Sequence, residues 1–242
     1  MKEVFAHYRS HLQGSPTQLP DPVPYARHIE WLGEQSRERA EEFWRRRLGD
    51  FAEPTELGIG GATGQSGFDD VAFRLDGQTT TKLGEFARAH RLTVNTIVQG
   101  AWSLLLSRYS GSDDVVYGSV VSGRHEGLAD AESMIGQFIN TLPVRTRVPA
   151  ERPVAEWLRD LQQEHVELRQ YEYTSLVDAQ NWSAVPKGEQ FFSSLLVFQN
   201  FPGLGADELP DGLTRKSCLD VERTGYPLTA IVYDSDRIKV NL

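Results

Sequence analysis

The strongest constraint on the fold is a long amphipathic helix followed almost directly by a strand that lacks a polar face. Residues 93–109 carry apolar side chains at steps of three and four, which predicts a helix capped by Thr93. The apolar positions expected to form its buried face are Val94, Ile97, Val98, Ala101, Trp102, Leu105 and Tyr109. Residues 114–124 hold four valines among few polar residues, which is typical of a strand covered on both faces. This order of elements favours an α/β fold with a covered sheet.

The other segments alternate between the same two patterns. Further helices are predicted over residues 2–12, 36–48, 80–90 and 153–170. Strands are predicted over residues 70–76 and 191–198, with a hairpin over residues 228–242. The helix at 36–48 has one apolar stripe, formed by Ala40, Phe43, Trp44 and Leu48. The strand at 70–76 alternates polar and apolar residues, so it is expected to be half-buried. The predicted fold is therefore a two-layer α/β sandwich, a mixed β-sheet covered by helices.

Composition and charge exclude several kinds of partner. The net charge of −9 argues against a surface for nucleic acid or for an anionic membrane. We find no apolar run long enough to span a bilayer. Cys218 is the single cysteine, which excludes a disulfide or a thiolate zinc site within the chain. His7 and His11 are spaced for a metal but have no evident third ligand, so no metal site is expected. We expect a cytoplasmic protein with no nucleic-acid or membrane partner.

Two polar positions near strand ends are candidates for a functional site. Arg124 follows Ser122 and Gly123 at the end of the valine-rich strand, where a charged side chain can turn into a cleft. The alternative is a surface salt bridge, and we favour the cleft. Substituting Gly123 is expected to redirect the strand end and so to mimic the loss of Arg124. Asn140 lies in an apolar run, so its amide needs partners if it is buried. It either clasps the backbone, which we favour, or lines a channel.

Taken together, these motifs resemble the condensation domain of nonribosomal peptide synthetases, which has a chloramphenicol-acetyltransferase-like fold. The resemblance rests on Ser122-Gly123-Arg124 followed by the sequence IGQFINTLPVR at residues 135–145. It extends to residues 25–31, 43–44, 171–183, 191–202 and 222–228. The matching motif residues outside the candidate site are Tyr25, Trp31, Ile135, Gly136, Phe138, Thr141, Pro143, Arg223 and Pro227. Arg27 and His28 depart from the aspartate and the aromatic residue of the family pattern.

The resemblance implies both an architecture and a function. Residues 1–48 would supply a helix, a proline-rich linker and bridging helices at the end of an N-terminal lobe. Residues 49–242 would form the C-terminal lobe, which we expect to be truncated before its final elements. The implied function is amide formation between an acyl or peptidyl donor and an aminoacyl acceptor. Both are thioesters on the phosphopantetheine arms of peptidyl carrier proteins, and no other cofactor is implied. The residues expected at the substrate channel or lobe interface are Ser122, Gly123, Arg124, Asn140 and Arg145.

The catalytic signature of the family, His-His-x-x-x-Asp-Gly, does not occur in this sequence. The chain has six histidines, of which no two are adjacent and none is followed four residues later by aspartate. We therefore expect no catalytic residue here and no activity from the chain alone. The alternative function is a non-catalytic lobe or docking module that binds a carrier protein or a complementary lobe. We also expect apolar surface at Val4, Phe5 and Tyr8, and an unpaired strand edge at residues 238–242.

Overall fold

The computed structural model describes residues 2–17, 19–58, 67–200, 209–210, 212–214 and 223–242. The helical elements are α1 (Lys2–Gln13), α2 (Ala26–Gly33), α3 (Arg37–Leu48), α4 (Gly77–His90), α5 (Val94–Ser110), the 3-10 helix η1 (Ala131–Ser133), α6 (Val154–Arg169) and α7 (Leu176–Asn181). The strands are β1 (Ala72–Arg74), β2 (Asp114–Val121), β3 (Asn140–Arg147), β4 (Ser194–Gln199), β5 (Leu228–Tyr233) and β6 (Lys239–Asn241). Cys218 and Glu222 lie outside the described residues.

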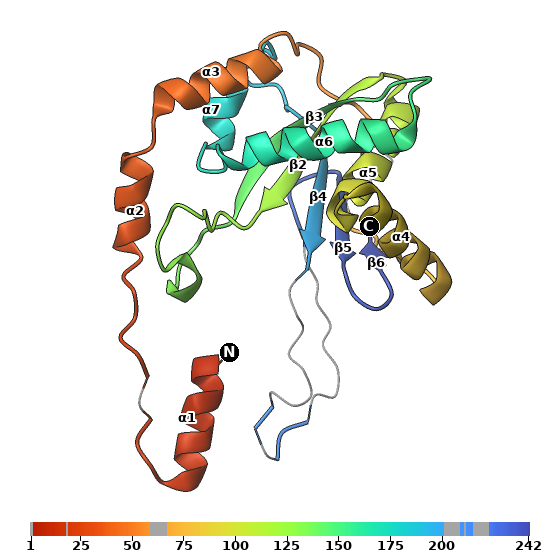
Figure 1. The fold of residues 1–242 in the computed structure, drawn as a ribbon. Coiled ribbons are helices and arrows are strands. Elements are labelled where there is room, and N and C mark those ends of the chain that lie inside the picture. Colours follow the sequence, from red (N-terminus) through yellow and green to blue (C-terminus); the bar gives the residue numbers. More distant parts are fainter. Residues whose placement is uncertain (1, 18, 59–66, 201–208, 211, 215–222) are drawn as a thin grey trace.

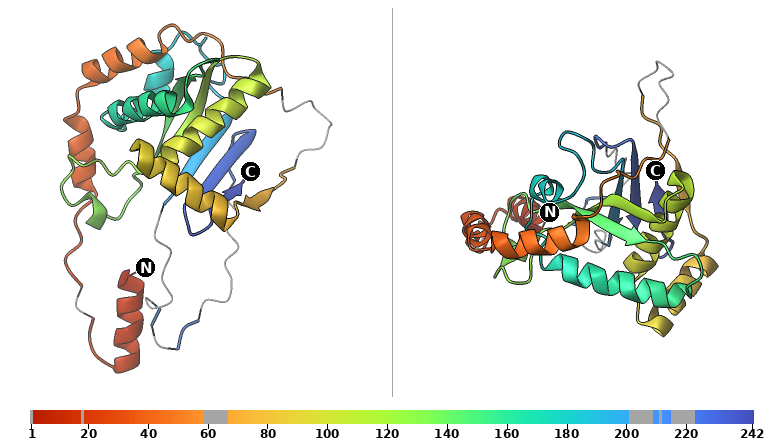
Figure 2. Two further views of the ribbon diagram at one scale, coloured as in Figure 1. Left: turned by 45° about the vertical axis from the view of Figure 1, so that its right-hand side comes forward. Right: turned by 90° about the horizontal axis from the view of Figure 1, so that it is seen from above.

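The strands form one mixed sheet in the order β1-β6-β5-β4-β2-β3. The β2–β4 and β4–β5 pairs are parallel, and the β2–β3, β5–β6 and β1–β6 pairs are antiparallel. Helices α4, α5 and α6 lie together against the sheet, while α7 packs beside β3 and α3 packs on α7 (Figures 1 and 2). This arrangement confirms the predicted α/β fold with a helix-covered mixed sheet.

The predicted apolar stripe of α3 is confirmed, since Ala40, Phe43, Trp44 and Leu48 are all buried in the main core. Ser36 caps this helix, because its hydroxyl accepts a hydrogen bond from the Arg39 amide at 3.2 Å. The stripe therefore attaches α3 to the side of the sheet formed by β2 and β3.

Helix α5 buries a different face from the predicted one. Its buried residues are Thr96, Gln99, Gly100, Trp102, Ser103 and Leu106. Trp102 is in the core as predicted, but Tyr109 is 73% exposed. Two contacts explain the shift. A side chain at Gly100 would place Cβ 2.3 Å from Leu158 of α6, and the Tyr117 hydroxyl donates a 2.8 Å hydrogen bond to Gln99. The close contact between α5 and α6 thus requires a small residue at position 100. The buried Tyr117 hydroxyl requires a polar partner at position 99.

The sheet edges also differ from the sequence-based expectation. All of β1 is exposed, with Phe73 at 46%, because β1 is the outermost strand rather than a half-buried one. Strand β6 is paired on both sides, with Val240 opposite both Val232 and Phe73, so the expected unpaired edge at residues 238–242 is wrong. Phe5, which was expected to be exposed, is buried, whereas Val4 is exposed.

Candidate functional site

Helix α2 packs against the long connection between β2 and β3 through a small separate core. The rings of Tyr25, His28, Trp31 and Phe138 gather there, and we call them the aromatic cluster. Leu128, Ala131 and Met134 are buried beside these rings, and Val23 packs against them. Segments about a hundred residues apart in sequence therefore meet at one place (Figure 1).

The aromatic cluster explains why Gly136 stands in the motif. A Cβ at this position would lie 2.1 Å from the ring of Tyr25. The Tyr25 hydroxyl donates a hydrogen bond to the carbonyl of Gln137, and its ring meets Phe138 edge-on at 5.2 Å. Two motifs that are separate in the sequence thus meet in one contact, which is formed by Tyr25, Gly136 and Phe138.

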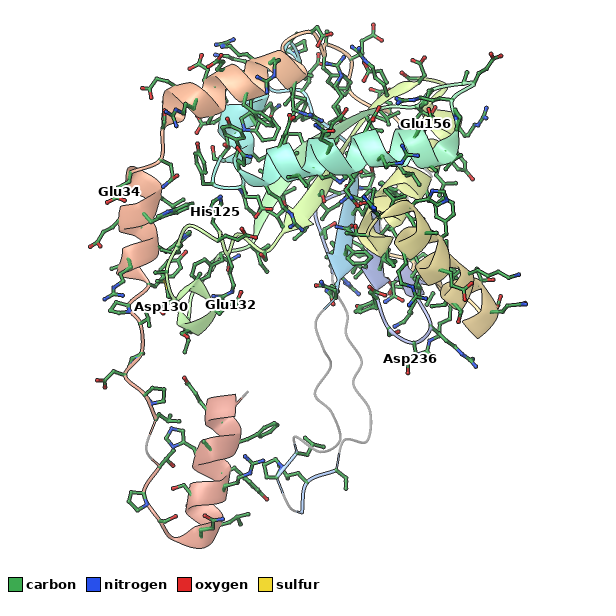
Figure 3. All side chains as sticks on the ribbon, in the orientation of Figure 1. Glu34, His125, Asp130, Glu132, Glu156 and Asp236 are labelled. Atoms are coloured by element: carbon green, nitrogen blue, oxygen red, sulfur yellow. The ribbon has the colours of Figure 1, made fainter. Side chains whose placement is uncertain are left out.

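Arg124 is bound to the same connection by backbone carbonyls. Its guanidinium donates hydrogen bonds to the carbonyls of Ala131 and Met134, the latter at 3.3 Å, and lies 4.2 Å above the centre of the Phe138 ring. Arg124 also lines a shallow cavity of about 350 Å³. The other lining residues are His125, Glu126, Leu128, Asp130, Ala131 and Glu132. Figure 3 labels three of them, His125, Asp130 and Glu132.

Gly123 is required by a close approach of two backbone segments. Its φ is +65°, and a Cβ there would lie 1.8 Å from the carbonyl oxygen of Phe138. The adjacent Ser122 hydroxyl accepts a hydrogen bond from the Arg124 amide at 3.4 Å. The two ends of the connection therefore touch at Gly123, which sets the direction in which Arg124 leaves β2.

Asn140 joins the start of β3 to the segment that follows α6. Its Nδ2 donates to the carbonyls of Glu172 at 2.8 Å and Thr174 at 2.7 Å. Its Oδ1 accepts from the amide of Thr141 at 2.9 Å. All of these partners are backbone groups, so the side chain has the geometry of a clasp.

We expect Asn140→Ala to lower the free energy of unfolding by about 1–3 kcal/mol, because two part-buried carbonyls would lose their donor. Urea denaturation followed by circular dichroism measures this. Asn181→Ala, at the exposed end of α7, is the matched control and should change stability by less than about 0.5 kcal/mol. Equal effects of the two substitutions would contradict the clasp.

Arg145 lies at the opposite end of the strand pair from Arg124. It makes a bidentate ion pair with Asp114, at 2.6 and 2.8 Å, contacts Asp50, and donates to the carbonyl of Arg47 at 2.8 Å. These contacts border a second groove, of about 650 Å³, between α3, α6 and the end of β3. The structure therefore does not bring Arg145 together with Ser122, Gly123 and Arg124.

The remaining motif residues occupy varied positions. Ile135 is exposed. Pro143 lies on the outermost strand β3, opposite Gly118 of β2, and an edge strand tolerates a residue without a backbone N–H. Arg223 stacks over Phe68 at 4.6 Å, and Pro227 directly precedes β5. These residues do not converge with the aromatic cluster into one site.

Three titratable residues near the cluster were not among the predicted site residues: His28, which the sequence analysis named only as a departure from the motif, and His125 and Glu172. His125 stacks on Trp31 at 5.0 Å, and its Nδ1 accepts the Gly127 amide at 3.0 Å. Burial raises the pKa of the Glu172 carboxyl, and the charge of Glu126 adds to this shift. No motif groups these residues, since they come from three distant segments.

Within the described residues, no three histidine, cysteine, aspartate or glutamate side chains lie close enough to share a metal ion. In the same part of the chain, none of the helices combines the length and the apolar character needed to cross a membrane.

The whole chain, residues 1–242, matches the family model for the condensation domain. One component of the linear gramicidin synthase of Brevibacillus parabrevis is 46% identical over 248 residues, covering 99% of this chain and 5% of the relative. A second component of the same synthase is 41% identical, covering 100% of this chain and 3% of the relative. The chain thus spans only a few per cent of the length of these curated relatives.

Two solved structures share the fold at low sequence identity. The X-domain from teicoplanin biosynthesis matches with a TM-score of 0.79 at 24% identity, covering 99% of this chain and 58% of that chain. The first condensation domain of the CDA synthetase matches with a TM-score of 0.76 at 19% identity, covering 99% and 54%. The mixed sheet and its helices therefore define an α/β protein of the chloramphenicol-acetyltransferase type. The chain belongs to the condensation-domain family of nonribosomal peptide synthetases, an acyltransferase-type enzyme family, which confirms the resemblance stated from the sequence.

Proposed function

We propose that this chain is the acceptor-side part of a condensation domain that joins two thioesters held on carrier proteins. The amine of an aminoacyl acceptor attacks the carbonyl carbon of an acyl or peptidyl donor. A C–N bond forms, the C–S bond breaks, and the thiol of the donor's phosphopantetheine arm leaves. The attacking ammonium must also lose protons, so a base or a hydrogen-bond acceptor is required.

One observation carries this proposal, namely the contact that brings together Tyr25, Gly136 and Phe138. These family motif residues come from two distant segments, and their contact fixes the connection that carries Arg124. Arg124 and Asn140 are our candidates for the residues that border the substrate channel or the lobe interface. Arg124 presents a planar fork of donors suited to carbonyl and carboxylate oxygens, although the Ala131 and Met134 carbonyls already occupy part of that capacity.

We further propose that the proton acceptor is not supplied by these 242 residues. The His-His-x-x-x-Asp-Gly signature is absent from the sequence. Two of the six histidines are also weakened as bases, because burial lowers the pKa of His28 and lowers that of His165 to about 4. A complementary lobe that carries the signature would complete the site.

The second candidate function is a non-catalytic module that docks a carrier protein or a complementary lobe. The absent signature favours it. The likeness in fold to the teicoplanin X-domain is compatible with it, and that X-domain is also known in a complex with OxyB. The two candidates differ in whether a signature-bearing lobe restores amide formation.

The deciding experiment measures single-turnover amide formation between a loaded donor and a loaded acceptor carrier protein. The chain alone should give no amide above the uncatalysed rate, and addition of a lobe with the His-His-x-x-x-Asp-Gly signature should give amide. Binding of the carrier proteins without amide, even with the added lobe, would support the docking module instead. Amide formed by the chain alone, and unaffected by replacing each histidine in turn, would refute our assignment of the chemistry to the signature.

A further inference from the structure

His28 is the one titratable side chain of the aromatic cluster that is buried without a polar partner for Nδ1 among the described residues. The residue is 6% exposed and lies between the rings of Phe138, at 4.5 Å, and Tyr25, at 5.2 Å. It also stacks in parallel with Trp31 at 6.2 Å. A neutral imidazole suits this apolar site, whereas a charged one would lose its hydration without gaining an acceptor at Nδ1.

The charges around His28 oppose its protonation. The guanidinium of Arg124 lies on the same Phe138 ring that His28 contacts, so a charged His28 would share this ring with a second cation. The only carboxylate ion-paired to α2 in the described structure is Asp130, which lies 3.9 Å from Arg27 on the surface. The other titratable groups facing the cluster are two tyrosine hydroxyls and one imidazole. The Tyr25 hydroxyl is bound to Gln137, and His125 stacks on Trp31. Tyr173 meets Trp31 edge-on at 6.1 Å, and its hydroxyl donates to the carbonyl of Ser36 at 3.1 Å.

We propose that His28 is an acid-sensitive switch that holds α2 against the β2–β3 connection when neutral and releases α2 when protonated. The aromatic cluster packs α2 onto the connection together with Leu128, Ala131 and Met134. Charging the His28 ring, which contacts Tyr25 and Phe138, weakens this attachment. This inference is independent of the proposed function, because it concerns only how residues 23–33 are held.

The sign of the effect follows from the direction of the pKa shift. Burial, and then the charge of Arg124, lower the pKa of His28 below the ordinary value of 6.5. A histidine whose pKa is lowered in the attached form favours that form fully when the pH is above the pKa of the free histidine. That contribution is lost as the pH falls below 6.5 toward the lowered pKa. The switch therefore opens on the acid side of neutrality.

Hydrogen–deuterium exchange of the full chain tests the switch. Exchange would be measured by mass spectrometry at about pH 8 and about pH 5, the interval in which an imidazole changes its charge, and corrected for intrinsic rates. Residues 23–33 and 124–138 should lose protection at the lower pH by a clearly larger factor than the internal reference, because a charged His28 weakens the contact between them. Residues 94–110 of α5 are the internal reference, because this helix contains no histidine and a global acid effect would still appear there.

Two variants complete the test. His28→Phe should abolish the selective acid effect. If circular dichroism shows that His28→Phe is unfolded, His28→Gln is used in its place and should abolish the same effect. His125→Asn, which removes the other imidazole next to Trp31, should keep the effect. The proposal is wrong if the wild-type chain shows no selective loss of protection, if a folded His28 variant retains that loss, or if His125→Asn removes it.

Discussion

Replacing Gly123 by alanine is expected to destabilise the protein by at least about 3 kcal/mol, the largest effect of any single methyl group that we anticipate. Two costs combine at this position. The backbone has a φ of +65°, which a residue with a side chain adopts at a cost, and the added Cβ would lie 1.8 Å from the Phe138 carbonyl oxygen. Relief requires the two ends of the β2–β3 connection to separate, which also moves Arg124. Guanidinium denaturation monitored by circular dichroism measures the loss.

Gly84→Ala is the matched control for the Gly123 substitution. Gly84 lies inside α4, and a Cβ there meets nothing within 4 Å. Alanine at this position should raise the free energy of unfolding by about 0.5–1 kcal/mol, because it restricts the unfolded chain and favours the helix. If Gly123→Ala is as stable as the wild-type chain, the close approach at Gly123 is wrong. This geometry also corrects the expectation that a Gly123 substitution would act only through Arg124, since most of its effect is now expected in stability.

Arg145→Ala should cost about 2–3 kcal/mol, the second largest effect. The Arg145 side chain is only 10% exposed and links Asp114, Asp50 and the carbonyl at the end of α3. Removing it leaves the half-buried Asp114 carboxylate with the weaker 3.3 Å contact to Arg147, and it removes the hydrogen bond that links the end of α3 to β3. The hydrogen bonds to Asp114 and Asp50 also raise the pKa of Arg145, so the guanidinium keeps its charge. Thermal unfolding at neutral pH measures the loss.

Arg147→Ala is the control for Arg145→Ala. Arg147 is on the same strand and contacts the same two aspartates, but its side chain is 71% exposed. Exposed ion pairs contribute at most about 1 kcal/mol, so this variant should be nearly as stable as the wild-type chain. Should the two variants lose equal stability, burial of Arg145 would not explain its effect.

The sequence-based predictions were most successful where the apolar spacing within a single helix or hairpin is enough to define its structure. The stripe of Ala40, Phe43, Trp44 and Leu48 is buried as predicted, because a surface helix needs only a single apolar face. The hairpin of β5 and β6 was also found, since its two strands are close in sequence. The family motifs identified the chemistry class, which no local pattern could have done.

The prediction failed where a residue's environment is supplied by distant segments. Buried Gln99 and Gly100 are explained by Tyr117 and Leu158, and neither partner is visible from the periodicity of α5. Likewise, Arg124 was expected at a cleft and does line a cavity, but its hydrogen bonds to the carbonyls of Ala131 and Met134 and its position over Phe138 were not predicted. Such contacts depend on how the β2–β3 connection closes, which the spacing of motifs does not reveal.

The pairing of β1 with β6 has a consequence for how the chain folds as it is synthesised. Ala72 pairs with Asn241, so the earliest strand of the described sheet must wait for the last of these strands to leave the ribosome. Long-range pairing of this kind slows folding, because the entropy cost of closing the long loop comes before the stabilising contacts form. Until that point, the backbone N–H and C=O groups of β1 have no partner strand, which leaves this segment open to pairing with other chains during translation.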